Sequence, residues 1–160
     1  MNGVHLVCFR IGKETYGVDI STVREIVRVE EITRVPGTPE FVLGVVNLRG
    51  RILSVVDLGH RLGLAPSTVT TSSRILVTQL DGVSVGFLVD AATEVAKIAA
   101  EQVEPPPTFT GSVDVEYLEG VAKWGEELII ILNPSQILGS SQAAVVAASA
   151  NGAKVPAESI

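Results

Sequence analysis

Short runs of apolar residues recur along the chain in pairs, and a turn signal separates the two members of each pair. Such pairs predict antiparallel β-hairpins. The runs lie at residues 6–11 and 16–20, 41–48 and 52–56, 74–80 and 83–89, and 117–124 and 128–132. The third hairpin is the clearest, because Asp81-Gly82 supplies the positive φ of a type I′ turn. The pattern predicts a mainly all-β chain.

Short helical turns are predicted between the hairpins. Thr22-Val23-Arg24-Glu25 has the form of a capping box. Asp57 is suited to cap a helix that Gly63 ends, and Asn133 to start one that Gly139 ends. Residues 94–98 continue as a strand or a short helix, and prolines at 36–39 and 105–107 interrupt regular structure.

The hairpins suggest an internal repeat. A shift of 76 residues places Phe41 on Tyr117 and Gly44 on Gly120, and a shift of 69 residues places Gly17 on Gly86. Two β-rich stretches also resemble each other without duplication, because alternation and turns recur in both. If the chain is duplicated, we expect two similar barrels of about five strands, in which closure protects the sheet edges.

Composition supports a β-rich globular chain and argues against a nucleic-acid partner. The 160 residues include 25 valines and 12 isoleucines, and 46% of all residues are hydrophobic. β-Branched residues favour strands. The 12 basic residues are scattered among 18 acidic ones, which gives a net charge of −6. A phosphate-binding surface needs clustered basic side chains instead.

The residues offer no catalytic constellation. Cys8 is the single cysteine, so it has no disulfide partner within the chain, and we expect a buried, inert thiol. Neither His5 nor His60 has a second ligand at a metal-binding spacing. The glycines at 44 and 50 lack the Lys-Ser/Thr of a phosphate loop. The sequence predicts no cofactor, no metal, no signal peptide and no membrane span.

The hairpin tip Leu48-Arg49-Gly50-Arg51 is unusual, because it places two arginines on an otherwise apolar hairpin. One interpretation is a solvated, charged turn. The other is that Arg49 reaches back to a carboxylate such as Glu25 and orders a surface groove, since a partly buried arginine needs a partner. The pattern alone favours neither.

Several motifs closely resemble the CheW family, the coupling proteins of bacterial chemotaxis. The most specific is G-V-V-N-L-R-G at residues 44–50, followed by I-L-S-V-V-D-L at 52–58. Further matches are Y-G-V-D-I at 16–20, V-R-E-I at 23–26, V-G-F-L-V-D at 85–90, the proline-rich 105–109 and Y-L-E-G at 117–120. The resemblance runs from about residue 6 to residue 139.

The resemblance implies two intertwined five-stranded SH3-like barrels with short helical turns. We expect a CheW-like domain over residues 1–139, with a first barrel at about 15–73 and a second at about 74–139 plus the N-terminal strand. Residues 140–160 are expected to form a flexible or helical tail. Because small barrels enclose little core, we expect the two to pack against one another.

The resemblance also implies a non-enzymatic adaptor in the cytoplasm, recruited to membrane receptor arrays without inserting into the membrane. Its partners would be the cytoplasmic hairpin tip of a methyl-accepting chemoreceptor and the regulatory domain of a CheA-type histidine kinase. An alternative is an accessory coupler of a motility or developmental pathway that binds receptor without the kinase. A small β-barrel enzyme or ligand-binding domain is an alternative of another class.

By position, the resemblance implies site residues of two kinds. The receptor-binding groove between the barrels would contain Val23, Glu25, Ile26, Arg49, Ile75 and Val95. The kinase-binding surface would contain Val42 and Leu43, with Phe109 in a second, ring-closing contact. For each of these residues the alternative is a role in core packing.

Overall fold

The computed structural model describes residues 3–80, 82–106 and 115–137. Most of these residues lie in strands, which confirms the predicted fold class. The strands are β1 (Gly3–Ile11), β2 (Glu14–Asp19), β3 (Val23–Arg28), β4 (Val42–Leu48), β5 (Arg51–Asp57), β6 (Arg74–Leu80), β7 (Val83–Val89), β8 (Ala91–Ala99), β9 (Val103–Glu104), β10 (Leu118–Trp124) and β11 (Glu127–Leu132). The short helices are η1 (Ile20–Thr22), α1 (Leu58–Arg61), η2 (Ala100–Gln102) and η3 (Val115–Tyr117).

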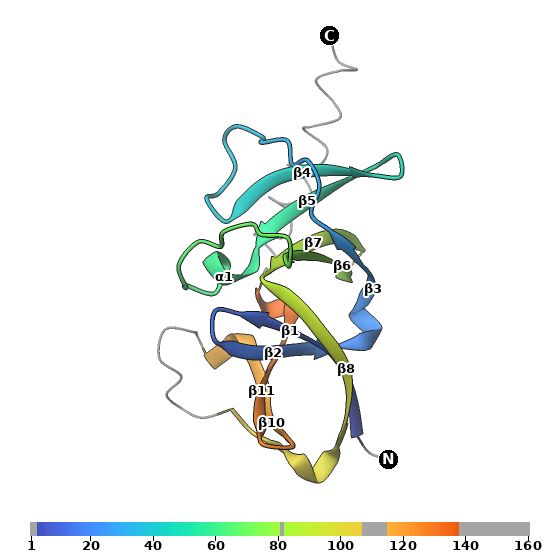
Figure 1. Cartoon of the computed structure of the whole chain (residues 1–160), viewed down its shortest axis with the longest axis vertical. Helices are drawn as coiled ribbons and strands as arrows, with labels where there is room; N and C mark the ends of the chain where they lie inside the picture. The colour runs from blue at the N-terminus through green and yellow to red at the C-terminus, as the bar shows by residue number, and fades with distance from the viewer. Residues whose placement is uncertain (1–2, 81, 107–114, 138–160) are drawn as a thin grey trace.

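The strands form two sheets (Figure 1). The first barrel, as we call the five-stranded sheet, has the order β3-β6-β7-β5-β4. The second barrel has the order β8-β1-β2-β11-β10-β9, in which β9 contributes only two residues. All four predicted hairpins are present as antiparallel pairs of neighbouring strands.

The predicted barrel boundaries are wrong in one respect. β2 pairs with β1 in the second barrel, and β6 and β7 belong to the first. The first barrel is therefore the continuous segment 23–89, and the second combines 3–19 with 91–132. The reason is that each half of the sequence donates its leading hairpin to the other barrel, where its second strand pairs in parallel with a strand from the other half. Residues 140–160 lie outside the described residues.

The residues that pair in this exchange are at equivalent positions of the internal repeat. Val55 lies opposite Gly86 in the first barrel, and Ile131 lies opposite Gly17 in the second. The shift of 76 moves Val55 to Ile131, and the shift of 69 moves Gly17 to Gly86. The two parallel pairs thus occupy equivalent positions, which supports duplication over chance similarity of β sequences.

Register irregularities recur in the same way. β4 carries an extra residue at Leu43 and β10 carries one at Glu119, and these positions are 76 residues apart. β3 and β8 have matching irregularities at Arg24 and Thr93. Because a bulge bends its strand and increases the twist, equivalent bulges give both sheets the same curvature.

The bulge at Glu119 has a consequence for pH dependence. Desolvation of the Glu119 carboxyl group and the nearby Asp19 carboxylate raise its pKa. The folded state therefore disfavours the ionised form, and ionisation of Glu119 lowers stability as the pH rises. We expect Glu119→Gln to raise the free energy of unfolding at neutral pH, with the gain lost as the pH falls from the raised pKa to the ordinary carboxyl pKa. Denaturant titrations across pH measure this.

Glu119 is itself exposed, so we expect the effect to be small. The matched control is Glu126→Gln, which removes the same charge from another exposed position, in the β10–β11 turn. An equal gain in both variants at neutral pH would mean that relief of the overall negative charge, and not the environment of Glu119, causes the stabilisation.

The predicted helix caps are present in the structure, with one exception. Asp57 caps α1 by accepting the His60 backbone N–H at 3.2 Å, and Asn133 accepts the backbone N–H of Ser135 at 3.1 Å, as predicted. The capping box at 22–25 is wrong, because Asp19 caps η1 instead and β3 begins at Val23. Edge pairing with β6 outweighs the local helical signal.

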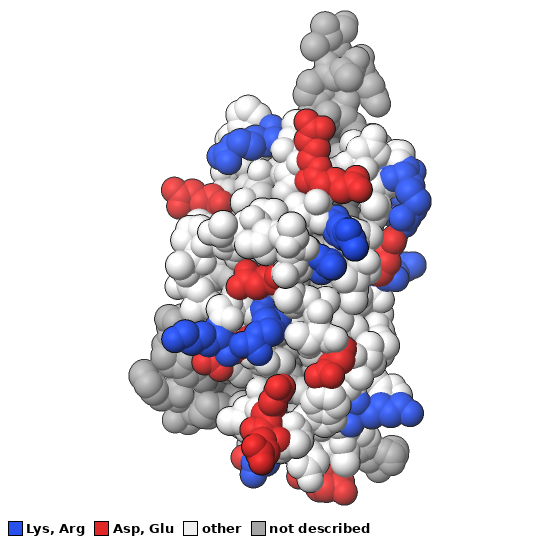
Figure 2. All heavy atoms as spheres, viewed as in Figure 1, with Lys and Arg blue, Asp and Glu red and all other residues white. Residues whose placement is uncertain are grey.

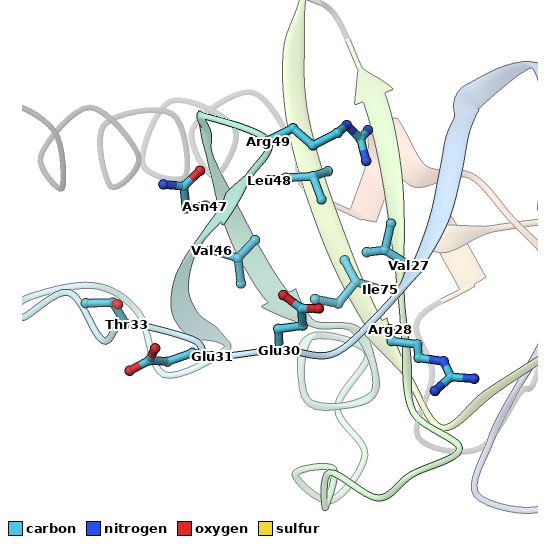
Figure 3. A pocket seen from close by; sticks show the side chains of 10 residues that line it. All are labelled: Val27, Arg28, Glu30, Glu31, Thr33, Val46, Asn47, Leu48, Arg49 and Ile75. Atoms are coloured by element: carbon cyan, nitrogen blue, oxygen red, sulfur yellow. The ribbon is translucent and has the colours of Figure 1, made fainter.

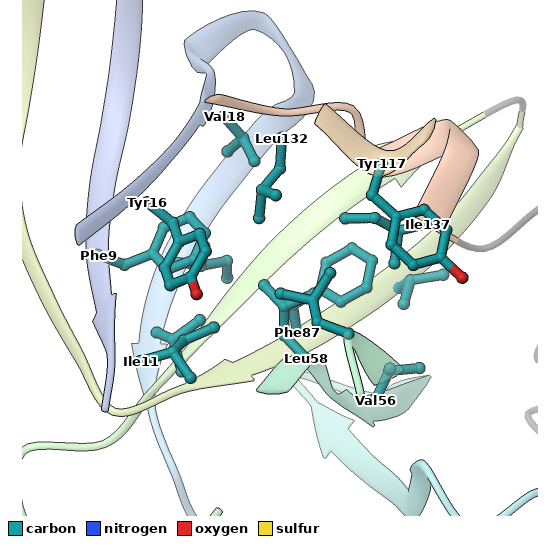
Figure 4. Close-up of a cluster of buried hydrophobic side chains, with 14 of the residues drawn as sticks. Phe9, Ile11, Tyr16, Val18, Val56, Leu58, Phe87, Tyr117, Leu132 and Ile137 are labelled. Atoms are coloured by element: carbon teal, nitrogen blue, oxygen red, sulfur yellow. The ribbon is translucent and has the colours of Figure 1, made fainter. Parts of the chain in front are cut away.

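Three groups of buried side chains hold the fold together. Each barrel encloses a small cluster of its own, and the larger one lies between the sheets. Figure 4 shows Phe9 and Tyr16 of the second barrel facing Phe87 and Val56 of the first. The shared cluster confirms that the barrels pack against one another.

The Arg61 guanidinium at the end of α1 joins the two halves of the repeat. It lies 5.0 Å from the centroid of the Phe41 ring and 5.4 Å from that of Tyr117. These aromatic residues are the equivalent pair that the shift of 76 superimposes. Stacking a cation on both rings fixes the starts of the two equivalent hairpins relative to each other.

Candidate functional site

The first barrel is left open along one seam. Its edge strands are β3 and β4, which do not pair with each other in a regular ladder. Two polar contacts join the sides of the seam among the described residues. Thr33 exchanges two backbone hydrogen bonds of 2.8 Å with Val45, and the Arg49 guanidinium donates to the Glu25 carboxylate. The contact between Arg49 and Glu25, one of the two interpretations that the sequence left open, is therefore present.

The turn that carries Arg49 is locally strained. Leu48 pairs with Arg51, so Arg49 and Gly50 form a two-residue turn with φ of 52° and 86°. The Asn47 side-chain oxygen accepts the Gly50 backbone N–H at 2.8 Å. Arg49 is the one non-glycine residue with positive φ among those described. Since type I′ turns favour Asn, Asp or Gly, this arginine stands against the local preference, which is typical of functional positions.

The ion pair contributes little stability by itself. The side chain of Arg49 is 67% exposed and that of Glu25 is 34% exposed. Pairs this accessible contribute at most about 1 kcal/mol. The pair therefore mainly fixes the position of the hairpin tip over β3.

The ion pair separates two hollows along the seam. The first has a volume of about 500 Å³ and is drawn in Figure 3. Val27, Val46, Leu48 and Ile75 surround its apolar middle, and Glu30 and Glu31 lie on the segment that follows β3. The second hollow has a volume of about 440 Å³ and includes Arg24, Glu25, Arg49 and Arg51. Leu48 and Arg49 line both.

The predicted receptor-groove residues fall into three environments. Ile26 and Val95 are 42% and 54% exposed and occupy equivalent positions on the edge strands β3 and β8. Val23 is half-buried against the shared cluster. Ile75 is only 1% exposed, so it is a core side chain that forms the floor of the first hollow. Core packing is the correct description of Ile75.

Glu25 and Ile26 do not share a face of β3. Exposure alternates along this strand, with Val23, Glu25 and Val27 half-buried and Arg24, Ile26 and Arg28 exposed. The structure therefore brings Arg49 to Glu25 on one face and leaves Ile26 on the other.

The predicted kinase-binding residues are less accessible than expected. Val42 is 5% exposed and belongs to the shared cluster, so it does not present a docking surface. Leu43 is half-buried at the β4 bulge and packs against the core of the first barrel. Phe109 lies outside the described residues.

Sequence reasoning assigned no site role to Arg24, and it noted Arg51 only as a charge of the hairpin tip. Arg24 donates to the Gln79 side-chain oxygen, and Arg51 lies beside Arg49 at the second hollow. The strand alternation of β3, which places Arg24 outward, and the Arg-Gly-Arg turn are the sequence signals that point to them.

Cys8 is a buried thiol, as the sequence predicted. It is fully buried, and burial raises the pKa of its thiol to about 11, so the thiol stays protonated at neutral pH. In the part of the chain that the structure describes, no three His, Cys, Asp or Glu side chains gather closely enough to hold a metal ion. No helix in this part is long and apolar enough to span a membrane.

Comparisons with known proteins agree with this architecture. Residues 5–142 match the family model of the CheW-like domain. The chain is 33% identical to the chemotaxis protein CheW of Klebsiella aerogenes, over 90% of this chain and 87% of that protein. It is 32% identical to the protein FrzA of Myxococcus xanthus, over 88% of each chain.

The fold is also similar to that of a solved structure. The scaffolding protein TtCheW from Thermoanaerobacter tengcongensis superimposes with a TM-score of 0.79 at 37% identity, covering 89% of this chain and 92% of that one. The matched range includes both barrels and the open seam with its Arg49–Glu25 pair. This chain therefore belongs to the CheW family.

Proposed function

We propose that this protein is a non-enzymatic adaptor that couples methyl-accepting chemoreceptors to a CheA-type histidine kinase in the cytoplasm, at membrane receptor arrays. The observation that carries the proposal is the exposed, equivalent pair Ile26 and Val95 on the two edge strands, in a chain of the CheW family. Single exposed apolar side chains are common on protein surfaces, so the support comes from their equivalent positions on two unpaired strand edges together with the family of the chain.

The receptor partner that fits these strands is an amphipathic helical hairpin. Ile26 and Val95 would contact its apolar face. Glu25 lies on the other face of β3, so the Arg49–Glu25 pair would reach the hairpin along the free edge of that strand and fix its register through charge. Val23 and Ile75 support this surface from below. Signal transfer would be positional, because a change in the receptor hairpin shifts the equilibrium between coupler arrangements that differ in their affinity for it.

The kinase contact belongs to the same proposal. Leu43 is the less buried member of the pair predicted on β4, and it lies at a bulge in an edge strand of the first barrel. A ring-closing contact through Phe109 completes the proposed set.

A second candidate is an accessory coupler that binds receptor without the kinase. The likeness to FrzA, whose name is not that of a chemotaxis protein, is compatible with this candidate. The two candidates differ in one measurement, which is binding to a kinase regulatory domain.

Co-sedimentation and titration against a receptor cytoplasmic fragment and a kinase regulatory domain test the proposal. We expect micromolar binding to both for the wild-type chain. Ile26→Glu with Val95→Glu is expected to weaken receptor binding by about tenfold or more, because two apolar contacts become desolvated charges.

Val69→Glu is the matched control, since Val69 is 50% exposed and lies in the loop between α1 and β6, outside both edge strands. Wild-type binding to neither partner would refute the adaptor function. Binding to the receptor alone would support the accessory coupler.

A further inference from the structure

The second hollow of the seam combines an apolar floor with a cationic rim. It lies between β3 and the β4–β5 hairpin of the first barrel, on the far side of the Arg49–Glu25 pair from the first hollow. Leu53 and Val77 are buried at its floor, and Leu48 and Ile52 are half-buried beside them.

The residues that line this hollow carry a net positive charge. Arg24, Arg49 and Arg51 contribute three positive charges and Glu25 one negative charge, so the hollow has a net charge of about +2 in a chain whose net charge is −6. In Figure 2 one group of Lys and Arg atoms lies at the right edge, at the height of the β4–β5 hairpin tip in Figure 1, with acidic atoms beside it, while other basic side chains are spread over the rest of this face.

Two of these arginines have no carboxylate partner within the described residues. Glu25 is engaged by Arg49, and Arg24 donates to the neutral amide oxygen of Gln79. Arg51 makes no ion pair and no side-chain hydrogen bond with any described residue. The hollow therefore has unused donors for a planar anionic group, which the guanidinium geometry suits.

The repeat provides an internal comparison. The positions in the second barrel equivalent to Arg24, Arg49 and Arg51 are Thr93, Gly125 and Glu127. The same hairpin and edge strand form there without any of the three cations. The arginines are thus not required to build this barrel architecture, and another role must account for them.

We propose that this hollow binds an acidic side chain, together with its apolar neighbours, on the receptor helical hairpin. The inference rests on the proposed function and specifies the chemistry of the partner. Charge complementarity supports it, as does continuity, because Glu25 and Arg49 belong both to the hollow and to the expected receptor-binding surface. The carboxylate would be received by Arg24 and Arg51, with Arg49 held in place by Glu25.

The test compares two double charge reversals that change the net charge equally. Arg24→Glu with Arg51→Glu alters the hollow, and Lys13→Glu with Arg34→Glu alters exposed positions outside it and off the edge strands β3 and β8. Each is titrated with a receptor cytoplasmic fragment at low and high salt, and circular dichroism verifies the fold. We expect the first variant to bind about tenfold or more weakly with a shallower salt dependence, and the control to bind within about twofold of wild type.

A charge exchange completes the test. Fragments in which acidic residues near the hairpin tip are replaced by lysine are expected to bind the Arg24→Glu, Arg51→Glu variant better than the wild-type chain. Equal weakening of both double variants, or no weakening of the first, overturns the inference while wild-type binding leaves the adaptor function standing. Absence of wild-type binding refutes the adaptor function and this inference with it.

Competitors separate the other possible occupants. Inorganic phosphate or a single-stranded RNA oligomer, titrated into the wild-type complex, is expected to displace the receptor fragment only through the general effect of ionic strength. Displacement beyond that of sodium chloride at equal ionic strength, lost in the Arg24→Glu, Arg51→Glu variant, would identify a general anion site and contradict the inference.

Discussion

Replacing Gly44 by alanine is expected to destabilise the protein by about 3 kcal/mol or more. Gly44 has a φ of 149°, and an added Cβ would lie 2.1 Å from the Thr33 backbone oxygen. That oxygen accepts the Val45 N–H in one of the two polar contacts of the open seam within the described residues. Relieving the clash therefore separates Thr33 from β4 and opens the first barrel. Urea denaturation followed by circular dichroism measures the loss.

Two further alanine variants show which part of the cost is steric. Gly37 also has a positive φ of 83°, but an added Cβ meets nothing within 4 Å, so Gly37→Ala carries the backbone strain alone. Gly120→Ala places its Cβ 2.7 Å from the Glu104 backbone oxygen at the equivalent position of the second barrel. We expect Gly44→Ala to exceed both. A cost for Gly44→Ala no greater than that for Gly37→Ala would contradict the role given to the seam.

Replacing Arg49 by asparagine is expected to separate its functional role from its structural one. Asparagine tolerates the positive φ of this turn, so the change relieves strain of about 1 kcal/mol, while loss of the exposed pair with Glu25 costs a similar amount. Thermal unfolding should therefore remain close to that of the wild type. Binding to a receptor cytoplasmic fragment is expected to fall by about tenfold, because the hairpin tip loses its fixed charge.

Charge reversal at the same pair tests this separation further. Arg49→Glu places two carboxylates against each other at the seam. Adding Glu25→Arg restores an ion pair in which the two charges have exchanged positions. We expect the double variant to recover the stability lost by the single variant but not the receptor affinity. If Arg49→Asn and Arg49→Glu both bind receptor as the wild type does, Arg49 has a structural role only.

Local pattern was sufficient for the hairpins and failed where tertiary pairing competed with it. The Arg-Gly turn after Leu48 and the turn before Val83 follow from residues within a few positions, and both are present. The capping box at 22–25 follows equally well from local rules, yet these residues join β3 because β6 offers a full ladder of hydrogen bonds. A local signal of about 1 kcal/mol does not outweigh that pairing.

The candidate site shows the same division. The pairing of Arg49 with Glu25 was one of two open interpretations, because the sequence does not state how far a turn reaches across a seam. The burial of Ile75 and Val42 was only the alternative interpretation, because the sequence of a strand does not show which of its two faces meets the core. The cationic hollow was missed because Arg24 and Arg51 are distant in sequence and meet only when β3 and β5 form opposite sides of one curled sheet.

The sequence by itself determined the strands, the turns, the repeat and the family, because each depends on periodicity, turn chemistry or short motifs that neighbouring residues specify. Only the tertiary structure decided which hairpin completes which barrel. The parallel pairs of β7 with β5 and of β2 with β11 join residues from opposite halves of the chain, and no local pattern encodes their choice of partner. That exchange creates the shared core and leaves the first barrel with the open seam at which Arg49 meets Glu25.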